Sequence, residues 1–187
     1  MDGDDVIVGL TGKYAAGKGT AAAILMELGY QYHSLSDILR DELKARGIEE
    51  SREALLSVGN ELRQVDGPGA LAKRLLPKLK EGLHLVDSIR NPLEVEELRR
   101  LPKFVLVGID ADAEVRFKRL RSRDRQGDPE TWEKFVELEN RELESDDPAA
   151  QQLLRTFELS DRVLSNDQGL EELRSAVLAV LEDLGVA

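Results

Sequence analysis

The stretch Val6 to Thr20, VIVGLTGKYAAGKGT, decides the fold, because it joins an apolar run to a glycine-rich turn and a helix start. Residues 6–10 are apolar and mostly β-branched, which predicts a buried strand. The segment TAAAILMELG after the turn is rich in helix formers and ends at Gly29. A glycine turn in this place lets backbone N–H groups converge on an anion at the positive end of the helix. The stretch therefore predicts a phosphate-binding loop.

The spacing within the turn makes this prediction specific. Gly12 and Gly17 stand as in G-x-x-x-x-G-K, and Lys18 follows as a point charge for the outer phosphates. A glycine-rich turn with an exposed lysine is the alternative, which we disfavour because motif and context agree. The residues expected to bind nucleotide are Gly12, Ala15, Ala16, Gly17, Lys18, Gly19, Thr20 and Ala21.

Strand patterns alternate with helix patterns along the whole chain. The further predicted strands are 30–35, 84–89, 104–110 and 161–165. The alternation predicts an α/β fold with a parallel five-stranded sheet and helices on both faces. Ligands of such sheets bind at the carboxyl ends of the strands, where Asp37, Asp87 and Asp110 fall. We also expect Ser36 or Asp37 to cap the helix that ends at Gly47, and Pro77 to disturb a later helix.

Composition limits the classes of function. The 187 residues include 37 acidic and 26 basic ones, for a net charge of −11, which disfavours a nucleic acid polymer as partner. The chain has no cysteine, so a thiolate metal site and a cysteine nucleophile are excluded. No apolar run approaches the ~20 residues of a membrane helix. The acidic start MDGDD resembles no secretory signal, so we expect a cytoplasmic protein without a membrane partner, and the oligomeric state stays open.

The ending G-K-G-T of the loop resembles the adenylate kinase group of nucleoside monophosphate kinases. In that group the threonine hydroxyl meets nucleotide phosphate, and magnesium is held largely through water. The resemblance implies ATP and Mg²⁺ as cofactors, with Thr20 beside the phosphates and the metal. The stretch GLTG at 9–12 looks more like the opening of dephospho-coenzyme A kinases.

Two further segments are similar to acceptor-binding motifs of the same kinases. SLSDILR (34–40) resembles S-T-G-D-x-L-R, which implies that Asp37 lies near the phosphates and that Arg40 holds the acceptor's phosphate. DSIRN (87–91) resembles a shortened D-G-x-P-R. That resemblance implies that Asp87 holds magnesium waters and that Arg90 binds the acceptor phosphate bidentately. The alternatives are a helix-capping or turn aspartate with a surface arginine.

Basic residues gather in RFKRLRSRDR (116–125) after the fourth strand. Kinases similar to adenylate kinase carry lid arginines there, which close over the transferring phosphoryl group. Arg119 and Arg123 are four apart and can share a helix face, so they are the first candidates, with Arg125 next. A solvated basic helix is the alternative reading.

Two more residues are candidates by resemblance. Arg141 loosely resembles the arginine that ends a family lid. Asn166, in the stretch 161–173, resembles the loop whose backbone contacts adenine in nucleotide kinases. An ordinary strand-to-helix turn explains Asn166 equally well.

The motifs together predict a single P-loop kinase domain over 1–187, with an acceptor-binding insert at about 36–82 and a lid at about 119–157. The predicted reaction is phosphoryl transfer from ATP to a small phosphorylated acceptor, foremost a nucleoside or deoxynucleoside monophosphate. Dephospho-coenzyme A is the alternative acceptor. A non-catalytic nucleotide-binding regulatory module is the alternative of another class.

Overall fold

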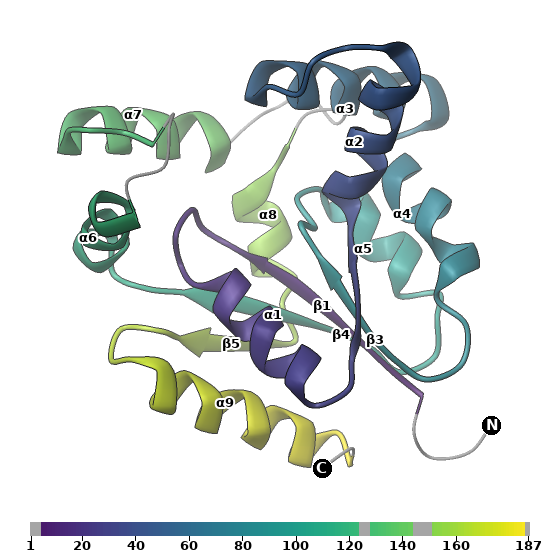
Figure 1. Cartoon of the computed structure of the whole chain (residues 1–187). Coiled ribbons are helices and arrows are strands. Elements are labelled where there is room, and N and C mark those ends of the chain that lie inside the picture. Colours follow the sequence, from purple (N-terminus) through teal and green to yellow (C-terminus); the bar gives the residue numbers. More distant parts are fainter. Residues whose placement is uncertain (1–4, 124–127, 144–150, 186–187) are drawn as a thin grey trace.

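The computed structural model describes residues 5–123, 128–143 and 151–185, and its centre is a five-stranded sheet. The strand order is β2-β3-β1-β4-β5, and every neighbouring pair is parallel. The strands are β1 (Val6–Gly12), β2 (Gln31–Ser34), β3 (Leu83–Asp87), β4 (Phe104–Asp110) and β5 (Arg162–Ser165). The predicted fold class is confirmed, and β1 with its glycine turn occupies the central position (Figure 1).

Helices cover both faces of the sheet, as the alternating pattern predicts (Figure 1). Those on the side of α1 are α1 (Lys18–Glu27) and α9 (Leu170–Asp183). Those on the other side are α2 (Leu35–Arg46), α3 (Arg52–Asp66), α4 (Ala70–Leu75), α5 (Pro92–Leu98) and α8 (Leu153–Glu158). Beyond the sheet lie α6 (Ala113–Arg123) and α7 (Trp132–Leu143). Each face has its own apolar core, so β1 is buried along its whole length.

The start of α2 differs from the expectation. Ser34, the last residue of β2, caps the helix by accepting a hydrogen bond from the Ser36 amide at 3.2 Å. The prediction of Ser36 or Asp37 as the cap was wrong, because the strand passes directly into the helix without a connecting loop. The end of α2 at Gly47 is confirmed, with a φ of 66° that glycine adopts easily.

The disturbance expected at Pro77 is present. The α-helix α4 ends at Leu75, and the chain continues as the 3₁₀ turn η1 (Leu76–Lys78). Proline lacks the N–H that an α-helix needs at such an interior position, so the tighter turn replaces the helix there. Within the described residues, no helix is both long and apolar enough to cross a membrane.

Candidate active site

The glycines of the loop are required by packing. Gly12 has a φ of 146° and Gly17 a φ of 107°, and both conformations are rarely open to other residues. A Cβ on Gly12 would lie 2.1 Å from the carbonyl oxygen of Ile109, and one on Gly17 would lie 2.0 Å from Nδ2 of Asn166. The backbone can therefore turn tightly between β1 and α1 only with glycine at these two places.

Lys18 lies folded against the loop. Its Nζ donates to the carbonyl oxygens of Gly12, at 2.7 Å, and of Lys13, at 3.1 Å. Desolvation, followed by the positive charge of Arg90, lowers the pKa of Lys18 to about 8. An anion beside this ammonium would stabilise its charged form. The loop, with its glycines and its half-enclosed lysine, thus fits the phosphates of a nucleotide.

Two predicted residues lie together at the outer rim of the loop. Asn166 donates from Nδ2 to the carbonyl oxygen of Ala16 at 2.8 Å. Arg119 donates from Nη2 to the carbonyl oxygen of Asn166 at 2.7 Å. The loop after β5 and the helix α6 are thereby joined to the phosphate loop. A contact of these residues with adenine stays a prediction.

Tyr14 of the loop contacts Arg123 of α6 and Asp128, which follows that helix in sequence. The Tyr14 hydroxyl donates to Asp128 Oδ1 at 2.5 Å, and Arg123 donates to both Asp128 oxygens at 2.7 and 3.0 Å. The guanidinium of Arg123 also lies over the Tyr14 ring, 5.1 Å from its centre. The structure therefore brings Arg123 to the loop, and its role as a lid arginine stays a prediction. Arg125 and the side chain of Arg141 lie outside the described residues.

Arg116 belongs to the basic cluster but has a structural role. It is buried, and it donates to the carbonyl oxygens of Ala111 and Tyr14. It also pairs with Glu139 of α7. A buried guanidinium with this many partners fixes α7 against the loop and is not available to a phosphate.

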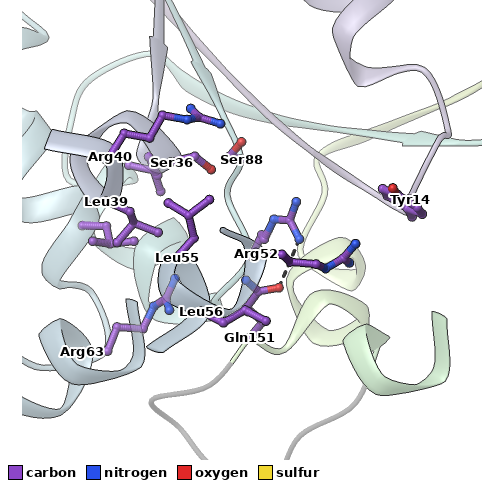
Figure 2. A pocket seen from close by; sticks show the side chains of 13 residues that line it. Tyr14, Ser36, Leu39, Arg40, Arg52, Leu55, Leu56, Arg63, Ser88 and Gln151 are labelled. Carbon is purple, nitrogen blue, oxygen red and sulfur yellow. Dashed lines mark hydrogen bonds between the residues drawn. The ribbon is translucent and has the colours of Figure 1, made fainter. Parts of the chain in front are cut away.

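An arginine-rich cavity of about 220 Å³ opens beside the loop (Figure 2). Its arginines are Arg40, Arg52, Arg63 and Arg90. Its leucines are Leu35, Leu39, Leu55, Leu56 and Leu71. Tyr14 belongs to the lining too, and none of the described lining residues carries a carboxylate. The cavity thus combines cationic walls with an apolar surface and shares a residue with the phosphate loop.

The structure places the two predicted acceptor arginines in this cavity. Arg90 donates from Nη1 to Gln151 Oε1 at 3.1 Å, and burial lowers its pKa. Arg40 is half-exposed and is paired with Asp37 at 2.6 Å and with Glu50 at 3.0 Å. Asp37 is not part of the lining, so its predicted position near the phosphates stays a prediction.

Asp87 lies at the carboxyl end of β3. It accepts from the Ser88 amide at 2.6 Å and from the Tyr32 hydroxyl at 3.2 Å. Its negative charge opposes the lowering of the pKa of Lys18. Asp87 is therefore close enough to the loop to influence the groups that would surround a phosphate.

Oxygen ligands for magnesium are few. The described residues contain no group of three or more side chains suited to hold a metal ion. Thr20, which is exposed at the start of α1, and Asp87 are the predicted ligands. Mg²⁺ in phosphate-transfer sites is usually bound through one or two carboxylates together with substrate phosphates and water. The residues present fit that kind of magnesium binding.

Some residues of the cavity were missed by the sequence analysis. Arg52 and Arg63 lie on α3, and Tyr14 is a variable position inside the loop motif. Arg63 carries a weak sequence signal, since it falls among the apolar positions of an amphipathic helix beside Leu62. Tyr14 and Arg52 carry none, because their significance depends on segments far apart in the chain.

The sheet order, the loop and its lysine define a P-loop protein with a kinase-like fold. Solved structures with this fold cover almost the whole chain. TT1252 from Thermus thermophilus aligns with a TM-score of 0.63 and 24% identity, covering 97% of this chain and 98% of that one. Shikimate kinase from Aquifex aeolicus aligns with a TM-score of 0.57 and 15% identity, covering 97% and 99%.

Sequence comparison identifies the family. Residues 8–147 match the family described as an AAA domain. A UPF0200 protein of Pyrococcus abyssi is 31% identical, over 96% of this chain and 97% of that protein. A UPF0200 protein of Hyperthermus butylicus is 32% identical, over 96% and 95%. The chain belongs to the UPF0200 family of AAA-domain proteins.

Proposed function

We propose that this protein transfers a phosphoryl group from ATP to a small anionic acceptor, foremost a nucleoside or deoxynucleoside monophosphate. The observation that carries the proposal is the arginine-lined cavity that shares Tyr14 with the phosphate loop. Phosphoryl transfer requires a second anion site beside the phosphate loop, whereas binding of a nucleotide alone does not. This favours an enzyme over a regulatory module.

The residues would act mainly by position and charge. Phosphoryl transfer needs alignment of donor and acceptor and neutralisation of charge on the transferring group. Lys18 would bind the outer phosphates, and Arg119 and Arg123 would approach them from the lid, about 119–157. Asp87 and Thr20 would orient magnesium, which offsets the charge of the phosphates when it is bound. No protein nucleophile is required, because the acceptor oxygen attacks directly.

The acceptor would lie in the insert, about 36–82, with its phosphate on Arg90 and Arg40. A guanidinium binds phosphate bidentately, which fixes the orientation of the attacking oxygen. The cavity of about 220 Å³ is smaller than the ~300–1,000 Å³ of sites for drug-sized ligands. This favours a monophosphate over dephospho-coenzyme A, whose pantetheine arm would lie outside the cavity.

A coupled assay of ADP release tests the proposal. It would contain Mg²⁺, ATP and, one at a time, each ribo- and deoxyribonucleoside monophosphate or dephospho-coenzyme A. We expect one class of monophosphate to stimulate release, and Lys18→Ala to lower that rate at least about 100-fold. If dephospho-coenzyme A alone stimulated ADP release, it would be the acceptor in place of a monophosphate. Tight ATP binding without stimulation by any acceptor would contradict the kinase proposal.

A further inference from the structure

Arg63 is a buried arginine with one end directed into the acceptor cavity. Only 4% of its side chain is exposed, and its Nε and Nη2 both donate to Glu94 Oε1, at 3.1 and 2.9 Å. Within the described part of the chain, its Nη1 has no hydrogen-bond partner. This atom is also not among the fully enclosed unpaired atoms of those residues. The cavity is therefore the space that Nη1 reaches.

The surroundings of Arg63 keep it in this position. Both oxygens of Glu94 are engaged, since Oε2 accepts from the amides of Arg90, at 3.0 Å, and Asn91, at 3.1 Å. Glu94 thereby joins Arg63 to the segment that carries the acceptor arginine. Gly59, one turn earlier on α3, leaves room, because a Cβ there would lie 3.1 Å from Nη1. A glycine inside a helix is less favourable than alanine.

Such an arrangement calls for a functional explanation. A buried ion pair is often no more stable than apolar side chains of the same volume. A leucine in place of Arg63 would extend the apolar surface formed by Leu39 and Leu55. The chain instead keeps a charged donor at the deep end of a cavity and holds it with a fully buried carboxylate. The donor is thus placed for a ligand.

The cavity offers hydrogen-bond donors at both ends. Guanidinium groups donate and never accept. Gln151 already uses its Oε1 for Arg90, which leaves its amide N–H groups for other partners. In Figure 2, Arg63 lies on the side of Leu39 and Leu55 away from Arg40, with Tyr14 at the far margin. A fitting acceptor has an anion at one end, a flat apolar middle and acceptor atoms at the other end.

We propose that Arg63 is the specificity-determining residue of the acceptor cavity and selects nucleoside monophosphates whose base turns a carbonyl oxygen toward it. Guanine, uracil and thymine carry a carbonyl oxygen where adenine and cytosine carry an amino donor. An amino group facing Nη1 would leave two donors in contact and both unsatisfied. The inference rests on the proposed kinase function and names the class of base.

The test compares base preference before and after removal of the charge pair. Arg63→Met alone would leave Glu94 charged and unpaired, so the variant is the double substitution Arg63→Met with Glu94→Gln. Glutamine at this position can still accept from the Arg90 and Asn91 amides as in a capping box. Arg46→Met is the control, since Arg46 likewise joins two helices by an ion pair, α2 to α3, but lies outside the cavity.

The kcat/KM values for uridine, thymidine, guanosine, adenosine and cytidine monophosphates give the result. We expect the native protein to prefer a carbonyl-edged base by about 100-fold, as hydrogen-bonded sites discriminate. The double variant should lose about 10- to 100-fold on that substrate, through KM, and should no longer discriminate. The control should keep the native preference.

Two outcomes would overturn the inference while leaving the kinase intact. One is a native preference for adenosine or cytidine monophosphate, and the other is a double variant that keeps the native base preference. Failure of every monophosphate to stimulate ADP release has a different meaning, because it contradicts the proposed function itself and removes the inference with it.

Discussion

The phosphate loop and the acceptor cavity meet at Tyr14, yet they are built in different ways. The loop is one continuous segment whose backbone is shaped by Gly12 and Gly17, and we expect backbone N–H groups to bind the anion there. The cavity collects side chains from α2, α3 and the segment after β3, and four of its lining residues are arginines. The loop should therefore respond most to changes in backbone shape, and the cavity to changes in side-chain charge.

The largest expected effect comes from Gly12→Ala. The added Cβ would collide with the Ile109 carbonyl oxygen at 2.1 Å, and the φ of 146° is unfavourable for alanine. We expect a loss of about 4 kcal/mol in the free energy of unfolding, from strain and collision together, and no measurable ATP binding. Thermal unfolding and calorimetric titration with ATP would measure the two effects.

Gly82→Ala is the matched control for this substitution. Gly82 also has a positive φ, of 110°, but a Cβ there would meet nothing within 4 Å. It should cost about 1–3 kcal/mol from backbone strain alone and leave ATP affinity unchanged. Equal losses of stability and binding in the two variants would show that the close approach to Ile109 has no special importance for the loop.

Removing a positive charge from the cavity should have the next largest effect, and it should change the binding of the acceptor only. Arg90→Met removes a half-buried guanidinium from the cavity. We expect the KM for the acceptor to rise about 100-fold, while the KM for ATP changes little, because a charge-assisted hydrogen bond to a phosphate is lost. Initial-rate kinetics with each substrate varied in turn would measure both constants.

Arg99→Met provides the control for Arg90→Met. Arg99 is an exposed arginine directly after α5 that pairs with Asp161 and is not part of the cavity lining. Both KM values should stay as in the native protein. If Arg90→Met raised the KM for ATP as much as the KM for the acceptor, the cavity and the phosphate loop would not act as separate regions.

The same difference explains what the sequence could predict. The loop, the parallel α/β sheet and the placing of Asp87 and Arg90 at the end of a strand follow from short continuous patterns, whereas the strand order does not. The position of Arg63 does not, because it depends on Glu94, which is distant in sequence and is brought to it only in the fold, where α3 and α5 both contact α4. The cap of α2 was also misplaced, because pattern alone does not show where β2 ends and the helix begins.

The interpretation of the basic cluster shows a further limit. The sequence analysis interprets the segment 116–125 as one cluster of lid arginines, with a solvated basic helix as the alternative, and gives no buried role to any of them. In the fold, Arg116 is buried with Glu139, whereas Arg123 reaches Asp128 and the Tyr14 ring. Which arginine faces inward is decided by the packing of α7, so a helical periodicity argument could not separate them.

The smallest expected effect is on the pH dependence of ATP affinity. It arises because a charge of the cavity influences Lys18 of the loop. The pKa of Lys18 is about 8, with Arg90 the largest cause after desolvation. A bound phosphate favours the protonated lysine, so the pKa of Lys18 is higher in the complex than in the free protein. ATP affinity should therefore be constant below pH 8 and fall above it, by at most about tenfold per pH unit, as the free lysine loses its proton.

Calorimetric titrations with ATP at pH 7 to 9.5, in buffers of different ionisation enthalpy, would measure this fall and the accompanying uptake of protons. In Arg90→Met, the most strongly repelling charge is gone, so the pKa of Lys18 rises and the fall in affinity begins at higher pH. A fall that begins at the same pH in both proteins would mean that the cavity does not influence the loop electrostatically. The boundary at Tyr14 would then separate two independent regions, and the acceptor arginines could not tune the binding of ATP.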